Sequence, residues 1–205
     1  MLHKILVLHG YRNNAARLKY QMLNLVKNLT TKGVEFVFLD SDILYTPEAK
    51  EEPLSEDELK KFGPYRKWWT TDRTRLLTQR DYDTGTEAVS QVENFIARNP
   101  DITCILGFSQ GSSLLQMLPS LALPQIKKVI LIGGIPVYDT EEKKLHRHAD
   151  TLHIIGQEDA VVQPEASKNL AKMFPNSKIY LHKGKHYVPT NKEACVTVLN
   201  YLNHK

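Results

Sequence analysis

The sequence predicts a doubly wound α/β domain, in which helices cover both faces of a parallel sheet. Short apolar runs rich in β-branched residues recur along the chain, and they alternate with stretches whose apolar residues have helical spacing. Strands that are apolar almost throughout are typical of sheets buried on both faces. The 205 residues are 41% hydrophobic, which is enough for one sizeable core.

Six short apolar runs are predicted strands, and right-handed crossovers are expected between them. In chain order they are Ile5–Leu8, Val34–Leu39, Ile102–Leu106, Val129–Ile132, Leu152–Ile155 and Ile179–Leu181. Helices are predicted from apolar faces. These faces are marked by Leu18, Met22, Leu25 and Leu29 before a C-capping Gly33; by Val89, Val92 and Ile96 before Pro100; by Leu114, Leu115 and Leu118; by Leu170 and Phe174; and by Val196, Leu199 and Leu202.

The segment 41–83 interrupts the alternation, because it contains no convincing strand. Ser55 and Glu58 have the spacing of a capping box, so a short exposed helix is expected to begin there. The dense charges around it are typical of a solvated face. A long insertion in a compact domain is commonly functional. We therefore expect one domain over residues 1–205, with a lid-like insertion at 41–83.

Composition excludes several classes of function. The formal net charge of +4 is small and scattered, which argues against a nucleic-acid or membrane surface. No apolar run is long enough to span a bilayer, and "MLHKILVLHG" is better interpreted as a first strand than as a signal peptide. Cys104 and Cys195 lie in apolar segments without CxxC spacing, so both are expected to be buried free thiols in a reducing compartment.

The stretch "LGFSQGSS" places two glycines symmetrically about a serine, between a predicted strand and a predicted helix. A chain that reverses so sharply forces Ser109 to positive φ, at a cost of about 1–3 kcal/mol. It also crowds the positions two before and two after, where Gly107 and Gly111 lack the Cβ that would collide. This pattern is the G-x-S-x-G nucleophile elbow, which exposes the serine hydroxyl above the sheet.

The partners of such a serine should follow it in the chain, in loops after later strands. "GQEDAVV" offers Glu158 or Asp159 as the acid, and Asp159 is preferred because only one of two neighbours can point inward. "HKGKHYVP" offers His186 as the base. Other histidines are weaker candidates for the base: His182 at a strand end, and His146, His148 and His153 in or beside polar loops. No histidine pair has HExxH spacing, and no metal is expected.

Acyl transfer also needs donors for the oxyanion. The backbone N–H of Gln110, directly after the serine, is one expected donor, and the N–H of Tyr11 in the loop after the first strand is the other. Gly10 allows that loop to approach the substrate closely, and His9 is expected to pack beneath it. This chemistry requires no cofactor.

With these residues identified, the chain resembles the FSH family of serine hydrolases from Lys4 to about Pro189. The matching segments are "ILVLHGYRNN", "GFSQGSS", "VILIGGIP", "LHIIGQEDAVV" and "HKGKHYVP", together with Trp68, Trp69 and Tyr82. The resemblance implies a compact α/β-hydrolase core of about six mostly parallel strands, in the order 2-1-3-4-5-6. It also implies carboxylesterase activity in the cytoplasm, with the nucleus as a second location, and Ser109, Asp159 and His186 as the triad.

The function expected from sequence is hydrolysis of small-molecule or lipid-like esters through an acyl-enzyme. Trp68 and Trp69 are expected to form an apolar wall of the acyl pocket, favouring medium to long chains. The alternative is that they anchor the insertion to the core. Two other functions stay open: an acyl-protein thioesterase or lysophospholipase with the same triad, and a binding protein on an inactive scaffold.

Overall fold

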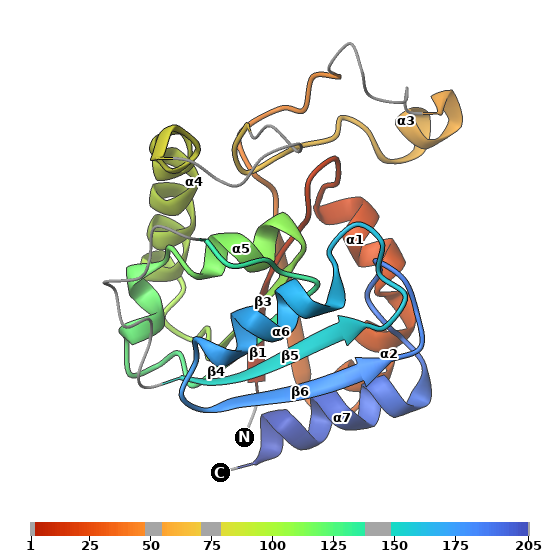
Figure 1. The fold of residues 1–205 in the computed structure, drawn as a ribbon, viewed down its shortest axis with the longest axis vertical. Coiled ribbons are helices and arrows are strands. Elements are labelled where there is room, and N and C mark those ends of the chain that lie inside the picture. Colours follow the sequence, from red (N-terminus) through yellow and green to blue (C-terminus); the bar gives the residue numbers. More distant parts are fainter. Residues whose placement is uncertain (1–2, 48–54, 71–78, 138–148, 205) are drawn as a thin grey trace.

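In the computed structural model, which describes residues 3–47, 55–70, 79–137 and 149–204, six strands form one parallel sheet (Figure 1). The strand order is β2-β1-β3-β4-β5-β6, which confirms the predicted order. The strands are β1 (His3–Leu8), β2 (Val34–Leu39), β3 (Cys104–Phe108), β4 (Lys128–Ile132), β5 (Asp150–Gly156) and β6 (Ser177–His182).

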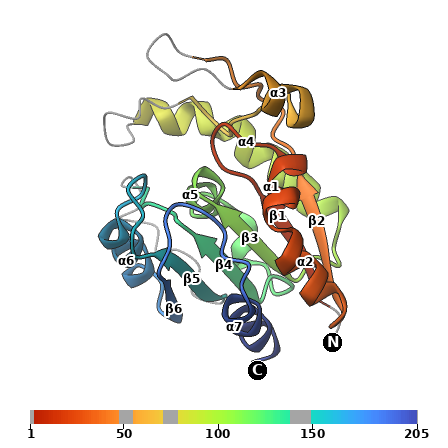
Figure 2. The same cartoon turned by 90° about the vertical axis from the view of Figure 1, so that its right-hand side faces the viewer.

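Helices cover both faces of this sheet (Figures 1 and 2). They are α1 (Ala15–Gln21), α2 (Leu23–Thr30), α3 (Glu56–Phe62), α4 (Gln79–Arg98), α5 (Gln110–Leu115), α6 (Pro164–Lys172) and α7 (Lys192–Asn203), with a 3-10 turn at Pro119–Ala122. The single helix predicted around Leu18–Leu29 is two helices, α1 and α2, which meet at Met22.

Two separate core clusters lie on the two faces of the sheet. Alternate strand residues divide between them, so Ile5 and Val7 of β1 pack under α1, α2 and α7, while Leu6 and Leu8 pack under α4, α5 and α6. Both cysteines are buried and free. The division follows from the period of two in a strand, which gives each face of a buried strand its own apolar set.

The carboxyl ends of the parallel strands meet at one edge of the sheet. Leu8 of β1 pairs with Gly107 of β3, and Phe108 of β3 pairs with Ile132 of β4. The loops that leave β1, β3, β4, β5 and β6 therefore start beside one another. This edge is where open α/β sheets carry their ligand sites.

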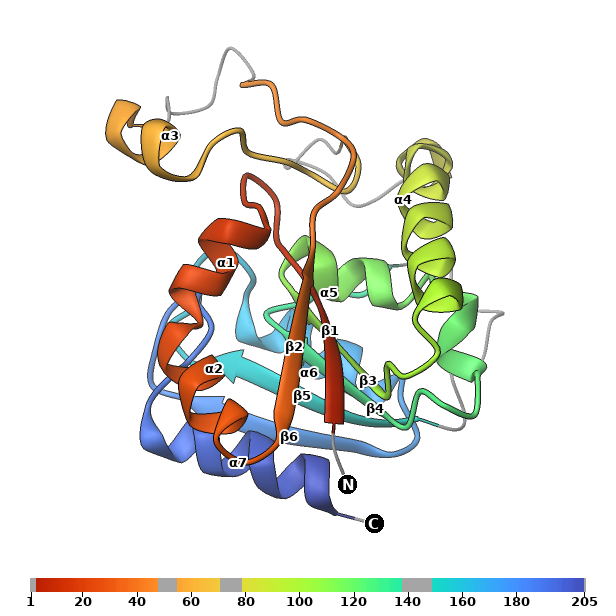
Figure 3. The ribbon, with the colours of Figure 1, turned by 180° about the vertical axis from the view of Figure 1, so that it is seen from behind.

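The described parts of the insertion lie over α1 and the loop after β1, on the carboxyl side of the sheet (Figures 1 and 3). Ser55 caps α3 through its side chain, which accepts from the N–H of Glu58 at 3.1 Å, and no residue of α3 is buried. The sequence predicted both features. Outside α3 and the start of α4, the described insertion contains only isolated bridges, where Arg66 pairs with Asn13 and Leu44.

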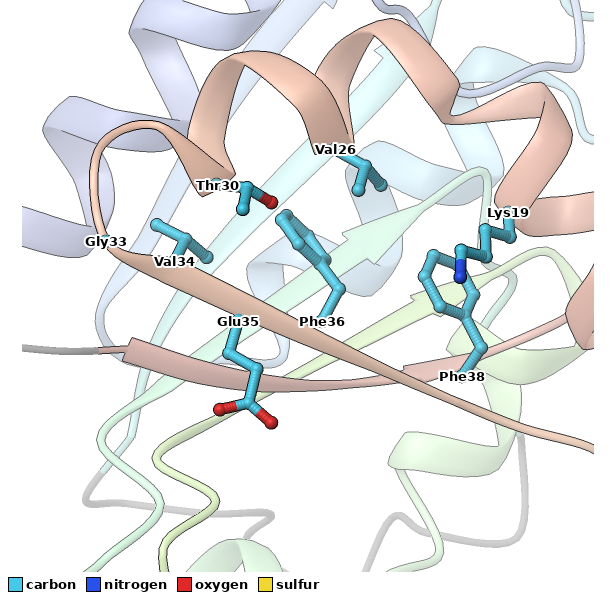
Figure 4. Close-up of a pocket in the computed structure, with 8 residues that line it drawn as sticks. All are labelled: Lys19, Val26, Thr30, Gly33, Val34, Glu35, Phe36 and Phe38. Carbon is cyan, nitrogen blue, oxygen red and sulfur yellow. The ribbon is translucent and has the colours of Figure 1, made fainter.

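A hollow of about 410 Å³ lies on the outer side of the edge strand β2, against α1 and α2. Phe36 and Phe38 point toward the helices, Glu35 points the other way, and Lys19 of α1 lies beside Phe38 (Figure 4). This hollow contains none of the candidate site residues, so it is separate from the sheet edge described next.

Candidate active site

Ser109 lies at the turn between β3 and α5, with φ of 54° and ψ of −117°. This is the positive-φ conformation that the glycine spacing predicts, and a non-glycine residue adopts it only at a cost of about 1–3 kcal/mol. The backbone N–H of Ser109 donates to the Ile132 carbonyl at 2.8 Å, which fixes the turn to the end of β4.

Gly107 and Gly111 are needed because backbone approaches both of them. A Cβ on Gly107 would lie 2.5 Å from the Gly111 carbonyl oxygen. A Cβ on Gly111 would lie 2.5 Å from the Leu8 carbonyl oxygen and 2.6 Å from that of His9. Real Cβ atoms do not approach backbone so closely, so any side chain here would displace α5 from β1 or β3.

Asp159 and His186 are hydrogen-bonded to each other. The carboxylate of Asp159, which is 4% exposed, accepts from His186 Nδ1 through Oδ2 at 2.7 Å. Its Oδ1 accepts from the backbone N–H groups of Val161 and Val162 at 2.9 and 2.8 Å. An ionised carboxylate can only accept, so the Nδ1 of His186 carries the proton and Nε2 is left as the acceptor.

The loops that carry this pair are joined by backbone hydrogen bonds. The N–H of Gln157 donates to the backbone carbonyl of His182 at 2.9 Å, and the N–H of Glu158 donates to the backbone carbonyl of Gly184 at 3.0 Å. The side chain of Glu158 is exposed, so the choice of Asp159 over its neighbour agrees with the geometry. The imidazole of His186 packs against Phe108, with ring centroids 5.0 Å apart.

Gly133, after β4, is a residue of this site that was not predicted from the sequence. Its φ is 56°, and a Cβ on it would lie 3.0 Å from Cε1 of His186. The imidazole therefore rests against bare backbone. The glycine pair after an apolar run, "LIGG", was the available signal.

The other candidate bases lie elsewhere. His182 is buried between Tyr180 and Tyr187, and burial lowers its pKa. His153 is buried beside Phe174, and its Nε2 is hydrogen-bonded to the Thr151 hydroxyl at 3.2 Å. His146 and His148 lie outside the described residues, as does the side chain of Tyr82.

Ser109 and His186 line the same pocket, which has a volume of about 510 Å³. No hydrogen bond joins the Ser109 hydroxyl to His186 among the described residues, and such bonds are often long in enzymes without substrate. The full lining is Tyr11, Asn13, Arg17, Gln21, Phe108, Ser109, Val161, His186, Tyr187, Val188 and Thr190. Only three of these side chains are purely apolar, so the pocket is more polar than the sequence led us to expect.

The loop after β1 lies directly beside Ser109. A Cβ on Gly10 would lie 3.1 Å from Cβ of Ser109, and Tyr11 lines the pocket. His9 is fully buried beneath the loop: its Nδ1 bonds to the Gly10 carbonyl at 2.8 Å, and its Nε2 accepts from the Ser41 N–H at 3.1 Å. This agrees with the packing role expected for His9.

Trp68 and Trp69 are buried in the core cluster under α4 and α5, and neither lines the pocket beside Ser109. Trp68 stacks on His9 at 4.9 Å between centroids, and its Nε1 donates to the His9 carbonyl at 2.7 Å. These contacts favour the anchoring alternative over the pocket wall. Adjacent tryptophans indicate burial, but their spacing does not reveal which cavity or core they enter.

The side chain of Gln110 joins the insertion to the serine turn. Its Oε1 accepts from the Trp68 N–H at 2.8 Å, and its Nε2 donates to the Trp69 carbonyl at 2.9 Å. Ser41 adds a second attachment, because its N–H donates to Nε2 of His9 at 3.1 Å, while its hydroxyl donates to the Lys67 carbonyl within the insertion at 2.6 Å. Gln110 was selected for its backbone alone, and nothing in the sequence separates this side-chain role from ordinary polarity.

We expect the fold to lose stability in acid because two histidines are buried neutral. Burial lowers the pKa of His9 to about 4 and that of His153 to about 4. The unfolded chain, with histidine pKa values near 6.5, binds these protons first, so stability is full above about pH 6.5 and is lost as the pH falls toward 4. The loss is up to about 2–3 kcal/mol per histidine at about pH 4.5.

Urea unfolding between about pH 7 and pH 4.5 measures this dependence. His153→Gln, which removes one titrating group, should give a shallower decline than the parent protein. His204→Gln, at an exposed position, is the matched control and should not change the slope. Equal slopes in His153→Gln and the parent would contradict the assignment.

Comparison with known proteins places these features in a family. The pattern of the family described as "Serine hydrolase (FSH1)" matches residues 1–198. The chain belongs to the FSH1 serine hydrolase family. Among its relatives, Esterase OVCA2 of Danio rerio is 26% identical, covering 97% of this chain and 96% of that protein. Esterase OVCA2 of Xenopus tropicalis is 28% identical, covering 91% of this chain and 86% of that protein.

Solved structures show the same fold as this FSH1-family chain. Esterase PE8 has a TM-score of 0.71 at 17% identity, covering 98% of this chain and 91% of that one. A carboxylesterase from Mesorhizobium loti has a TM-score of 0.68 at 18% identity, and the match covers 99% of this chain and 89% of that one. The fold is therefore that of the α/β hydrolases.

The described residues of the FSH1-family chain contain neither a helix that could span a membrane nor a cluster that could hold a metal ion. In these residues no helix has the length and apolar character that crossing a membrane requires. Within the same part of the chain, no group of three or more His, Cys, Asp or Glu side chains could hold a metal ion.

Proposed function

We propose that this FSH1-family chain is a carboxylesterase that works through an acyl-enzyme on Ser109. One observation carries the proposal: a serine on a strained turn opens into the same pocket as a histidine whose Nδ1–H is held by a buried carboxylate. The family supports a serine hydrolase, and both relatives compared above are named esterases.

In the proposed mechanism, Nε2 of His186 removes the proton of Ser109 as the hydroxyl attacks the ester carbonyl. Asp159 stabilises the imidazolium and keeps its proton on Nδ1. The backbone N–H groups of Gln110 and Tyr11 hold the oxyanion, each donor lowering the barrier by about 2.7–4 kcal/mol. His186 then protonates the leaving alcohol, and a water molecule repeats the sequence to release the acid.

Substrate size follows from the pocket. The preference for medium to long apolar acyl chains depended on Trp68 and Trp69 as a wall, and both are buried away from the pocket. A mixed polar lining and a volume of about 510 Å³ favour short to medium acyl groups instead. Cys104 and Cys195, both free thiols, support a cytoplasmic location as part of the proposal.

Labelling with a fluorophosphonate probe, followed by a screen of esters, thioesters and lysophospholipids, tests the proposal. We expect labelling of the parent protein and none of Ser109→Ala. We expect p-nitrophenyl esters to be hydrolysed fastest at short to medium chain length, with a fall toward palmitoyl. Absence of labelling in the parent protein would favour a binding protein on an inactive scaffold, and faster thioester turnover would favour a thioesterase.

A further inference from the structure

Arg17 gives the pocket beside Ser109 a positive charge that the proposed mechanism does not use. Among the described residues that line this pocket, Arg17 carries the only permanent charge, and none is an aspartate or glutamate. His186 is the only other lining residue that can become a cation, and it is engaged with Asp159. The pocket is therefore suited to a ligand that brings a negative charge.

The guanidinium of Arg17 is held in place but not saturated. One Nη2–H donates to Oε1 of Glu58 at 2.9 Å, and the group lies over the ring of Tyr65, 5.3 Å from its centroid. A guanidinium has five N–H donors, and among the described residues Glu58 is the only acceptor that hydrogen-bonds to the guanidinium of Arg17. The side chain is 25% exposed, so donors remain available to a molecule in the pocket.

The ion pair with Glu58 orients the guanidinium of Arg17 and still leaves it able to bind an anionic ligand in the pocket. Glu58 is on the exposed helix α3, its side chain is 43% exposed, and it does not line the pocket. Ion pairs at such exposed positions contribute little to stability, because water screens both charges. A substrate carboxylate in the pocket can bind the remaining donors side by side, which is the geometry that guanidinium groups favour.

Gln21 supplies a second donor on the same helix face. It follows Arg17 by four residues in α1, so both side chains project on one side, and both line the pocket. Asn13 donates its side-chain amide to Oε1 of Gln21 at 3.1 Å. That hydrogen bond uses the oxygen of the Gln21 amide and fixes its orientation, so the NH₂ group is left to donate to a ligand.

We infer that Arg17 and Gln21 form a carboxylate-binding subsite, and that the esters preferred by this pocket carry a free carboxylate. This inference rests on the proposed function, because it names the substrate class of the same site. The carboxylate can belong to the acyl part, as in a half-ester of a dicarboxylic acid, or to the alcohol part, as in an ester of a hydroxy acid. Neither source changes the donors that recognise it.

Matched substrate pairs test the inference and separate the two sources. Monomethyl glutarate against dimethyl glutarate probes an acyl-side carboxylate, and butyryl glycolate against its methyl ester probes an alcohol-side one. In at least one pair the acid should exceed its neutral partner in kcat/KM by about 10-fold or more. The preference should decline when KCl is raised from about 0.02 M to about 0.5 M.

Arg17→Gln should lower kcat/KM for the preferred acid by about 10–100-fold and leave its neutral partner within about 2-fold. Arg17→Lys, which keeps the charge but not the planar fork, should be intermediate. Lys19→Gln is the matched control, because it removes a charge from the same helix but on the β2 hollow, and it should change neither substrate. Glu58→Gln should keep the preference for the acid.

Equal rates for acid and neutral ester in both pairs would overturn the inference. So would an equal loss on both substrates in Arg17→Gln, or the same loss in Lys19→Gln. Calorimetric titration of Ser109→Ala with glutarate separates this result from failure of the proposed function. Binding that disappears in Ser109→Ala/Arg17→Gln supports the subsite even without turnover, and absence of binding counts against it.

Discussion

Replacing Ser109 or His186 by alanine is expected to lower kcat for ester hydrolysis by about 10⁵–10⁶-fold, and combining the two replacements should cost no more than either alone. In the proposed mechanism the two groups act as one unit, since a serine without its base is a poor nucleophile and a base without its serine has no proton to accept. The measurement is single-turnover hydrolysis of the preferred p-nitrophenyl ester by the three variants.

His182→Gln is the control for this prediction. His182 is near His186 in the chain but lies between two tyrosine rings, and it does not line the pocket. We expect this variant to keep its activity within a few-fold of the parent. A loss of activity in His182→Gln as large as that in His186→Ala would indicate that His182 is the base. Additive losses of activity in Ser109→Ala/His186→Ala would argue that the two residues do not act in the same step.

Asp159→Asn is expected to lower kcat by about 10⁴-fold while the protein stays folded. The asparagine oxygen can still accept from the N–H groups of Val161 and Val162, which accounts for the retained fold. Its NH₂ group then faces His186, and a donor at that position requires an unprotonated Nδ1. The remaining proton lies on Nε2, so the ring cannot serve as the base.

Glu158→Gln is the matched control, because it makes the same chemical change one residue away on an exposed side chain. Its kcat should equal that of the parent within about 2-fold. Steady-state kinetics with thermal unfolding of both variants separates loss of function from loss of fold. A fully active Asp159→Asn would show that the His186–Asp159 contact is structural only.

Much of the fold could be predicted because parallel strands that are buried on both faces have continuous runs of apolar residues. The inner strands β1, β3 and β4 were found within one or two residues of their ends. The edge strand β6 was predicted too short, since only Ile179–Leu181 stands out as apolar. Ile179 and Leu181 are 49% and 43% exposed, so burial did not select the residues around them. The other edge strand, β2, was predicted at its observed ends, Val34–Leu39, so the weak pattern of β6 follows from its exposed side chains and not from its place at an edge.

The candidate site was predictable to the extent that sheet topology decides it. Once the strands are parallel and ordered, the loops after β3, β5 and β6 must share one edge of the sheet. Ser109, Asp159 and His186 lie in these three loops, so the strand order alone brings them to the same edge. Arg17 was not predictable in this way. A charged residue on the polar side of an amphipathic helix looks like ordinary solvated surface until a neighbouring loop encloses it.

The described part of the insertion is attached to the core at two points, through the Ser41 N–H to His9 and through Trp68 and Trp69 to Gln110. This separates what must be conserved for the reaction from what can vary for recognition. No residue of α3 is buried and none of it takes part in these two attachments, so substitutions on its exposed side chains should leave both in place and alter mainly the molecules that the pocket accepts. For an engineer, that stretch is the natural place to diversify selectivity.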